Sequence, residues 1–97
     1  MHARMMTFQV RPGMIDQMIG LVRDSLVPVA ASQQGFRGGF ALTDRERERV
    51  VGVTLWDSEA DMIAGENNTY LQGQLGKLAD LVESAPVREH YEVSLRV

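Results

Sequence analysis

The chain has 97 residues, a net charge of −3 and 44% hydrophobic residues, which fits one globular domain over residues 1–97 with a single modest core. It contains no cysteine, so disulfides, thiolate zinc sites and a cysteine nucleophile are excluded. The basic residues, Lys77 and nine arginines, are scattered along the chain, which argues against a nucleic-acid partner.

The sequence also argues against a membrane. Its longest apolar runs are far shorter than the roughly 20 residues that a membrane-spanning helix requires. The N-terminus lacks the charged-then-apolar pattern of a secretory signal. We therefore expect a cytoplasmic protein that has no membrane as a partner.

The first third of the chain predicts a strand followed by a helix. Residues 5–10 are apolar and alternate in part, and the turn signal Arg11-Pro12-Gly13 ends this strand. Over residues 14 to about 33, apolar side chains recur at three- and four-residue steps, which is typical of a helix. Pro28 removes one backbone donor inside this helix and predicts a kink. Gly35 then predicts a left-handed stop.

The middle of the chain predicts a hairpin. Residues 36–43 and 50–56 have the pattern of strands, and residues 44–48 form the turn between them. Strict alternation places four side chains on one face of the first of these strands: Phe36, Gly38, Phe40 and Leu42. In the second of these strands, the side chains on both faces are largely apolar, so we expect other parts of the protein to pack against both faces of the sheet.

The last part predicts a broken helix and a final strand. Ser58 is placed to cap a helix, with Asp61 three residues further on. The Asn67-Asn68 pair interrupts this helix, and its apolar period resumes over residues 71–82. Residues 87–97 alternate again and predict the last strand.

The predicted order is strand, helix, strand, strand, helix, strand, which is the α+β, ferredoxin-like βαββαβ fold. In this fold two helices cover one face of a four-stranded antiparallel sheet. The other face, on the order of 400 Å² in projection, is left open, which is near the limit for a soluble monomer. We therefore predict a homodimer that packs sheet on sheet. The alternative is a monomer with a weakly apolar outer face.

Several segments are similar to those of a known family: Arg11-Pro12-Gly13, Leu26-Val27-Pro28, Gly35-Phe36-Arg37-Gly38, Leu55-Trp56-Asp57-Ser58-Glu59-Ala60-Asp61, Ala85-Pro86-Val87 and Tyr91-Glu92-Val93. Through them the chain resembles, over almost its whole length, the antibiotic biosynthesis monooxygenase-like (ABM) domains of the dimeric α/β barrel superfamily. These motifs are specific for the fold and much less so for the chemistry.

The resemblance implies a cofactor-independent monooxygenase that oxidises a small phenolic, quinol or anthrone-type aromatic to a quinone. Deprotonated substrate would react directly with oxygen, and the protein would supply a dry pocket, a base and donors for the developing oxyanion. The alternative is a non-catalytic dimer of the same fold that binds a small apolar ligand or serves as a scaffold. The lack of two ionisable groups at a recognisable catalytic spacing favours this alternative.

Three residues are candidates for the catalytic site. Trp56 stands at the position of the family's tryptophan, where its indole N–H would hold a substrate oxygen, or where its ring anchors the sheet to a helix. His90 is the best available base, or else part of the hydrated rim of the dimer interface. Tyr70 would orient the substrate with its hydroxyl, or it is a structural tyrosine.

Four further residues are candidates for substrate binding: Asn67, Asn68, Gly73 and Gly76. The two amides would donate to a bound oxyanion, or they cap the helix that follows. The two glycines share one helix face, where missing side chains would leave room for a ligand or permit close packing.

The sequence predicts neither a metal site nor a bound cofactor. The haem-degrading relatives carry an asparagine on the first strand and a ligating histidine in the second helical region. Here residues 5–9 lack the asparagine and residues 58–83 contain no histidine, which argues against haem degradation. His2 and His90 lie at opposite ends of the chain, without nearby carboxylate spacing, and do not make a zinc site.

Overall fold

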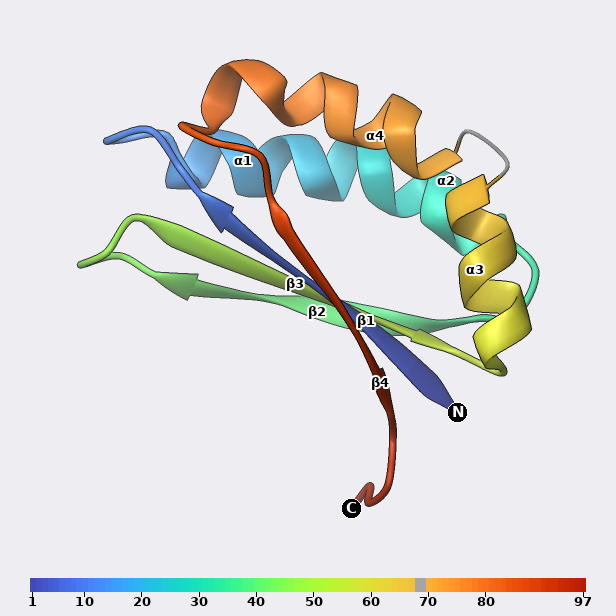
Figure 1. Cartoon of the computed structure of the whole chain (residues 1–97). Coiled ribbons are helices and arrows are strands. Elements are labelled where there is room, and N and C mark those ends of the chain that lie inside the picture. Colours follow the sequence, from blue (N-terminus) through green and yellow to red (C-terminus); the bar gives the residue numbers. More distant parts are fainter. Residues whose placement is uncertain (68–69) are drawn as a thin grey trace.

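The computed structural model describes residues 1–67 and 70–97, except for the side chains of residues 70 and 71. Its elements follow in this order: β1 (His2–Gln9), α1 (Ile15–Leu21), the π-helical turn η1 (Val22–Leu26), α2 (Val27–Ala31), β2 (Phe36–Asp44), β3 (Arg49–Trp56), α3 (Glu59–Asn67), α4 (Tyr70–Leu78), the 3₁₀ turn η2 (Ala79–Leu81) and β4 (Val87–Glu92). The strands form one sheet, and the helices lie over one of its faces (Figure 1). Within the described residues, no helix is long and apolar enough to cross a membrane.

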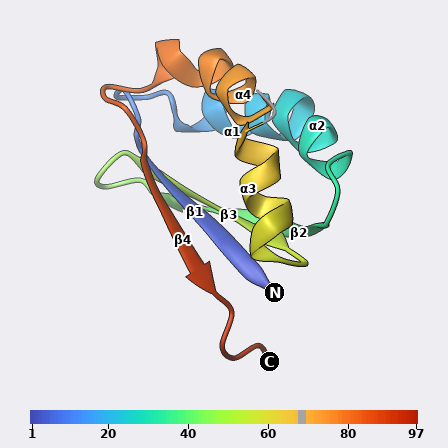
Figure 2. The same ribbon diagram turned by 45° about the vertical axis from the view of Figure 1, so that its right-hand side comes forward.

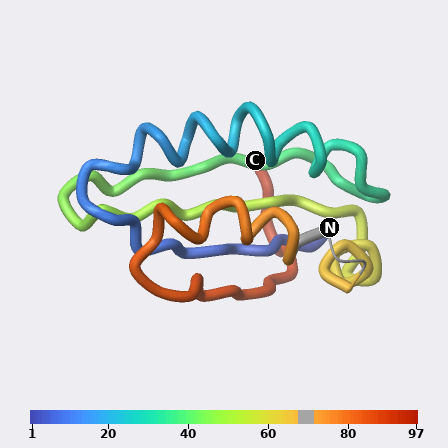
Figure 3. Tube along the Cα trace, turned by 90° about the horizontal axis from the view of Figure 1, so that it is seen from above, coloured from blue at the N-terminus to red at the C-terminus, as the bar shows by residue number. Residues whose placement is uncertain are grey.

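The strands are arranged in the order β2-β3-β1-β4, and every neighbouring pair is antiparallel. This order confirms the predicted ferredoxin-like α+β fold. Seen from above, the helical region from α1 to α2 runs along the β2 side of the sheet and α4 runs along the β1 side (Figure 3). The helix α3 stands at one end of the sheet, next to the point where β3 ends (Figure 1).

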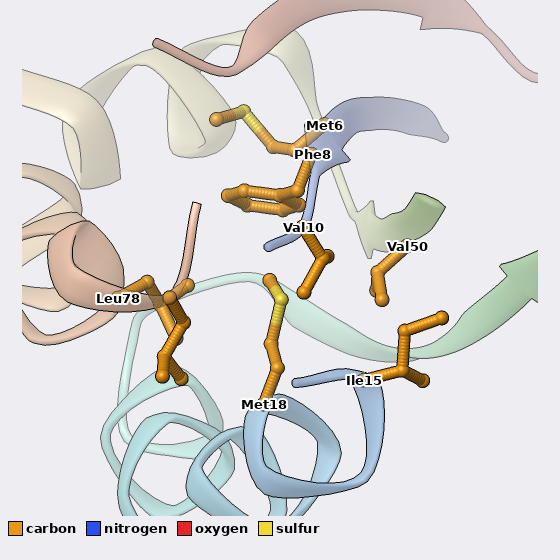
Figure 4. Packing of buried hydrophobic residues seen from close by; sticks show 8 residues of the cluster. Met6, Phe8, Val10, Ile15, Met18, Val50 and Leu78 are labelled. Atoms are coloured by element: carbon orange, nitrogen blue, oxygen red, sulfur yellow. The ribbon is translucent and has the colours of Figure 1, made fainter. Parts of the chain in front are cut away.

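The hydrophobic core lies between the sheet and the helices. Met6, Phe8 and Val10 alternate along the first strand and its extension, so all three point to the same face and are buried. Met18 of α1 and Leu78 of α4 are almost fully buried in the same cluster (Figure 4). This packing holds both helical regions on one face of the sheet.

The first helical region contains a widened turn in front of Pro28. Proline has no backbone N–H to donate to the carbonyl of Asp24, so the regular hydrogen-bond ladder cannot continue there. The N–H of Val27 instead donates to the carbonyl of Val22, five residues back, and residues 22–26 form a π-helical turn. The irregularity predicted at the proline is thus a one-residue widening of the helix.

The predicted faces of β2 are wrong beyond Gly38. This glycine has a φ of +95°, and the pairing register with β3 shifts between Phe36 and Gly39. Because a bulge adds one residue to one strand, it reverses the face of every side chain that follows. Phe36 stays on the helix side, but Phe40 and Leu42 lie on the face without helices and are more than half exposed.

The last strand is shorter than predicted, since β4 ends at Glu92 rather than at Val97. It is an edge strand whose neighbour β1 begins at His2, and its last ladder bond runs from the N–H of Val93 to the carbonyl of Met1 at 3.0 Å. Residues beyond 93 therefore pass the end of their neighbour. They leave the sheet on the side away from the helices (Figure 1 and Figure 2).

The junction between α2 and β2 lies against the junction between β3 and α3. The N–H of Asp57 donates to the carbonyl of Gly35 at 2.8 Å. The rings of Phe36 and Trp56 make an edge-to-face contact, with centroids 5.5 Å apart. Arg37 donates to the Asp57 carboxylate at 2.5 Å and lowers the pKa of that carboxyl. The end of the first helical region and the start of the second therefore form one unit.

Ser58 caps α3 as predicted, because its hydroxyl oxygen accepts a hydrogen bond from the N–H of Asp61 at 3.1 Å. The Asp61 side chain lies against Gly35, where any Cβ would collide with its carboxyl group. Gly35 also has a φ of +79°, a conformation that other residues rarely adopt. A glycine is therefore required here both for its backbone conformation and because there is no space for a side chain.

The substitution Gly35→Ala tests this double requirement, and Gly13→Ala is its matched control. Gly13 has the same φ of +79°, but a Cβ there meets nothing within 4 Å. We expect Gly13→Ala to lower the free energy of unfolding by about 1 kcal/mol through backbone strain alone. Gly35→Ala should cost about 2 kcal/mol more, because the collision with Asp61 is added. Urea unfolding measures both, and equal losses would contradict this account.

Candidate functional site

A cavity of about 560 Å³ lies between the sheet and the helices. The strands β1, β2 and β3 form its floor, and α1, η1, α2 and α4 form its walls. Most of its lining is apolar, with Met6 and Phe8 from the sheet and Met18, Val22 and Leu78 from the helices among the contributors. This size and character are typical of small-molecule sites.

The cavity exists because small residues occupy the inward positions of β2 and β3. Gly52 pairs with Ala41, and both line the cavity floor. A Cβ placed on Gly52 would meet nothing within 4 Å, so the glycine leaves open space. Gly39 also lines the floor, but for a different reason, since a Cβ there would collide with the carbonyl oxygen of Val53 on β3. Sequence reasoning treated Gly52 only as part of an apolar strand, although a glycine inside a strand often marks the close approach of a ligand and was the available signal for this floor.

Three polar side chains from the interior line the cavity: Arg4, Thr54 and Gln74. Arg4 is 2% exposed and Gln74 is 9% exposed. Arg4 and Thr54 are paired residues of β1 and β3, so they lie side by side on the floor. Arg23 also contributes to the lining, but its side chain is 70% exposed and pairs with Asp24. The polar groups are therefore few and differ in what they can bind.

The buried guanidinium of Arg4 has a carboxylate, a carbonyl and an aromatic ring around it. Its Nη1 lies 3.6 Å from the Oε1 of Glu66 and donates to the carbonyl of Met62 at 3.4 Å. Its Cζ lies 5.1 Å from the centroid of the Trp56 ring, which is cation–π geometry. These contacts offset the cost of burying a charge.

Trp56 does not line the cavity but contacts residues that do. The side chain is fully buried, and its indole N–H donates to the hydroxyl oxygen of Thr54 at 2.9 Å. Its ring contacts Arg4 and Phe36, and these two residues and Thr54 line the cavity whereas Trp56 does not. This geometry favours the anchor interpretation of Trp56 over direct contact with a substrate.

His90 belongs to a charged cluster at the edge of the sheet, which we call the Glu66 cluster: Arg4, Glu66, Arg88 and His90. The Nε2 of His90 lies 2.6 Å from the Oε1 of Glu66, and the Nε of Arg88 lies 3.7 Å from the same oxygen. The Glu66 side chain is only 8% exposed, whereas that of His90 is 37% exposed. His90 pairs with Arg4 across the sheet but does not line the cavity.

None of the other predicted residues whose side chains the structure describes lines this cavity. Gly73 and Gly76 lie on exposed positions of α4, where a Cβ meets nothing within 4 Å, so they do not make room between helix and sheet. Asn67 is exposed at the end of α3. Asn68 and the side chain of Tyr70 lie outside the described residues, so their roles stay predictions.

Sequence reasoning missed Arg4, Glu66 and Gln74. The predicted first strand began at Met5, one residue too late to include Arg4, although Arg4 continues the inward alternation of Met6. Glu66 and Gln74 gave no comparable signal, since a single acidic or amide residue on a helix is normally solvated. Within the described residues, no group of three or more histidine, aspartate or glutamate side chains is placed to hold a metal ion.

The model of the antibiotic biosynthesis monooxygenase family matches residues 1–73. No curated protein matches by sequence.

Several solved structures share the fold. A Streptomyces coelicolor monooxygenase from the gene ActVA-Orf6, in complex with nanaomycin D, has a TM-score of 0.83 at 16% identity, covering 99% of this chain and 89% of that one. The heme-degrader MhuD of Mycobacterium tuberculosis, with two hemes bound, has a TM-score of 0.80 at 22% identity, covering 100% and 99%. A Nitrosomonas europaea protein of unknown function has a TM-score of 0.80 at 21% identity, covering 99% and 91%.

The substitution Glu66→Ala tests whether the Glu66 cluster holds Arg4 in place. It removes a carboxylate from beside a buried guanidinium, and we expect the free energy of unfolding to fall by about 3 kcal/mol. The control is Glu59→Ala, which removes the exposed partner of His2 and should cost less than about 1 kcal/mol. Urea unfolding of both variants is the measurement, and a loss at Glu66 no larger than at Glu59 would refute the assignment.

Proposed function

The chain belongs to the antibiotic biosynthesis monooxygenase family, and on this basis we propose that it oxidises a small phenolic, quinol or anthrone-type aromatic with molecular oxygen. The reaction takes place in the cavity between sheet and helices, without a bound cofactor. The observation that carries the proposal is the apolar cavity of about 560 Å³ with the buried cation Arg4 in its lining. Apolar walls suit an aromatic body, and a buried cation suits an oxygen atom that gains negative charge.

The reaction balances without a further reductant. In an anthrone-type substrate a CH₂ carbon loses two hydrogens and gains one oxygen atom to become a carbonyl. The second oxygen atom of O₂ leaves with the two hydrogens as water. The reactive species is the deprotonated, electron-rich substrate, and Arg4 lowers the free energy of that anion by its charge. The largely apolar lining strengthens this interaction because it lowers the effective dielectric constant around the two charges.

The Glu66 cluster has a supporting role in this proposal. Glu66 holds Arg4 by its carboxylate, and His90 and Arg88 contact the same carboxylate from β4. Trp56 and Thr54 complete the support, the first below the guanidinium and the second beside it. His90 stays the predicted base; it contacts Glu66 on the side of the cluster away from the cavity and does not itself line the cavity.

The second candidate function is the binding of a small apolar ligand without catalysis. One observation favours it: among the described residues that line the cavity there is no histidine, aspartate or glutamate. A general base normally lies within hydrogen-bond reach of the proton that it removes. The two candidates share the cavity and differ in whether oxygen is consumed there.

We also propose that the chain forms a homodimer through the face of the sheet that carries no helices. Phe40, Leu42, Val87 and Tyr91 lie on this face and are each about half exposed. Val51 and Val53 of β3 and Met5 of β1 lie on the same face between them, so apolar side chains extend across all four strands. A contiguous apolar surface of this kind on a small domain is typical of an interface.

Oxygen uptake with a panel of hydroquinones and anthrones tests the enzymatic proposal. The wild type should consume oxygen with at least one of them, and Gly52→Val should lower that rate at least about tenfold, because the new side chain fills the cavity floor. The control is Gly76→Val, which places the same side chain on an exposed helix position. Equal rates in all three proteins would place the reaction elsewhere. Binding without uptake would favour the non-catalytic candidate.

Sedimentation at micromolar concentration tests the dimer. The wild type should sediment as a dimer, and Leu42→Lys should sediment as a monomer, since the charge would be buried in the interface. Ala31→Lys, on an exposed position of α2, should leave the dimer intact. A monomeric wild type would end this part of the proposal.

A further inference from the structure

Gln74 is the one buried polar side chain of the cavity lining whose acceptor the described structure leaves without a partner. It lies on α4, is 9% exposed and lines the cavity together with Leu75 and Leu78. Its Oε1 is buried and has no hydrogen-bond partner. Buried acceptors are nearly always paired in folded proteins, so this oxygen calls for a donor that enters the cavity.

The position of Gln74 in the helix makes a purely structural role a poor explanation. Leu78 follows it by one helical turn and is buried in the core, so Gln74 occupies the inward stripe of α4. A leucine or methionine would fill the same place without an unpaired oxygen. Gln72, two residues earlier, is exposed and has water for its amide.

We propose that Gln74 is a specificity-determining residue that selects aromatic ligands carrying a hydroxyl group, by accepting a hydrogen bond from that hydroxyl at Oε1. The inference rests on the proposed function in that it assigns the ligand to the same cavity. It also specifies which chemical group of the ligand binds Gln74 and which binds Arg4.

Arg4 imposes the opposite requirement on the same ligand. A guanidinium has only donors, so the ligand must present an acceptor oxygen, a carbonyl or a phenolate, toward Arg4. The Oε1 of Gln74 only accepts, so the ligand must present a donor toward α4. The cavity therefore selects a hydroxylated aromatic that also bears a carbonyl or phenolate oxygen. An aromatic hydrocarbon of the same shape leaves Gln74 Oε1 unpaired and is rejected.

The test compares two probes of nearly equal shape, 2-naphthol and 2-fluoronaphthalene, of which only the first carries an O–H donor. Their dissociation constants are measured by naphthalene fluorescence on the full chain under anaerobic conditions. We expect the wild type to bind 2-naphthol about tenfold tighter or more. In Gln74→Met this ratio should fall to about one or below, because the more apolar probe no longer faces an unpaired acceptor.

Two further variants keep the outcome interpretable. Gln72→Met makes the same chemical change at an exposed position of the same helix and should keep the wild-type ratio. Gln74→Leu provides a second removal of the acceptor, with circular dichroism as the check that each variant is folded. A ratio near one in the wild type, an unchanged ratio in both Gln74 variants, or no binding of either probe would overturn the inference. Because the measurement needs no turnover, a failure of the oxygen reaction leaves its result unaffected.

Discussion

The burial of one charge, the guanidinium of Arg4, organises the functional half of this domain. A buried cation is costly unless charged and polar groups surround it, and here these groups come from different elements. Glu66 reaches it from α3, and Trp56 lies against it at the end of β3. Because Glu66 also contacts Arg88 and His90, the same carboxylate ties the edge strand β4 to α3 and β1. At the Arg4 end, the cavity therefore has a buried positive charge that residues of α3 and β3 hold in place.

The space inside the cavity exists because small residues, rather than bulky ones, occupy the floor positions of β2 and β3. Gly52 and Ala41 face each other on the helix side of β3 and β2, and the helices bridge over the space that they leave. The bulge at Gly38 turns Phe40 to the opposite face, so that a bulky ring does not fill the floor. The π-helical turn before Pro28 contributes Val22 and Leu26 to the wall. A small domain can thus hold a ligand-sized space without losing its core.

Much of the fold could be predicted, and the reasons are local. Periodicity identified the strands and the helices, Ser58 marked the start of α3, and Gly35 marked the stop before β2. The errors had physical causes that periodicity does not carry. A single extra residue at Gly38 reversed the face of Phe40, and the end of β4 depended on where its neighbour begins.

The candidate site was harder to predict, because its chemistry depends on partners that are distant in the sequence. Trp56 and His90 were identified as residues of interest, but the structure shows the indole N–H donating to Thr54 and the histidine ring bonded to Glu66. Arg4 and Gln74 became candidates only when the sheet and α4 enclosed a common space.

By itself, the sequence determined the order of elements, the fold and the membership of a family, because these follow from turn residues, caps and apolar period, which act over short distances. Only the tertiary structure decided which polar groups lose their water and meet inside the cavity. The reason is that burial is a property of the whole packed chain: the same amide is solvated at Gln72 and enclosed at Gln74, two positions apart on one helix.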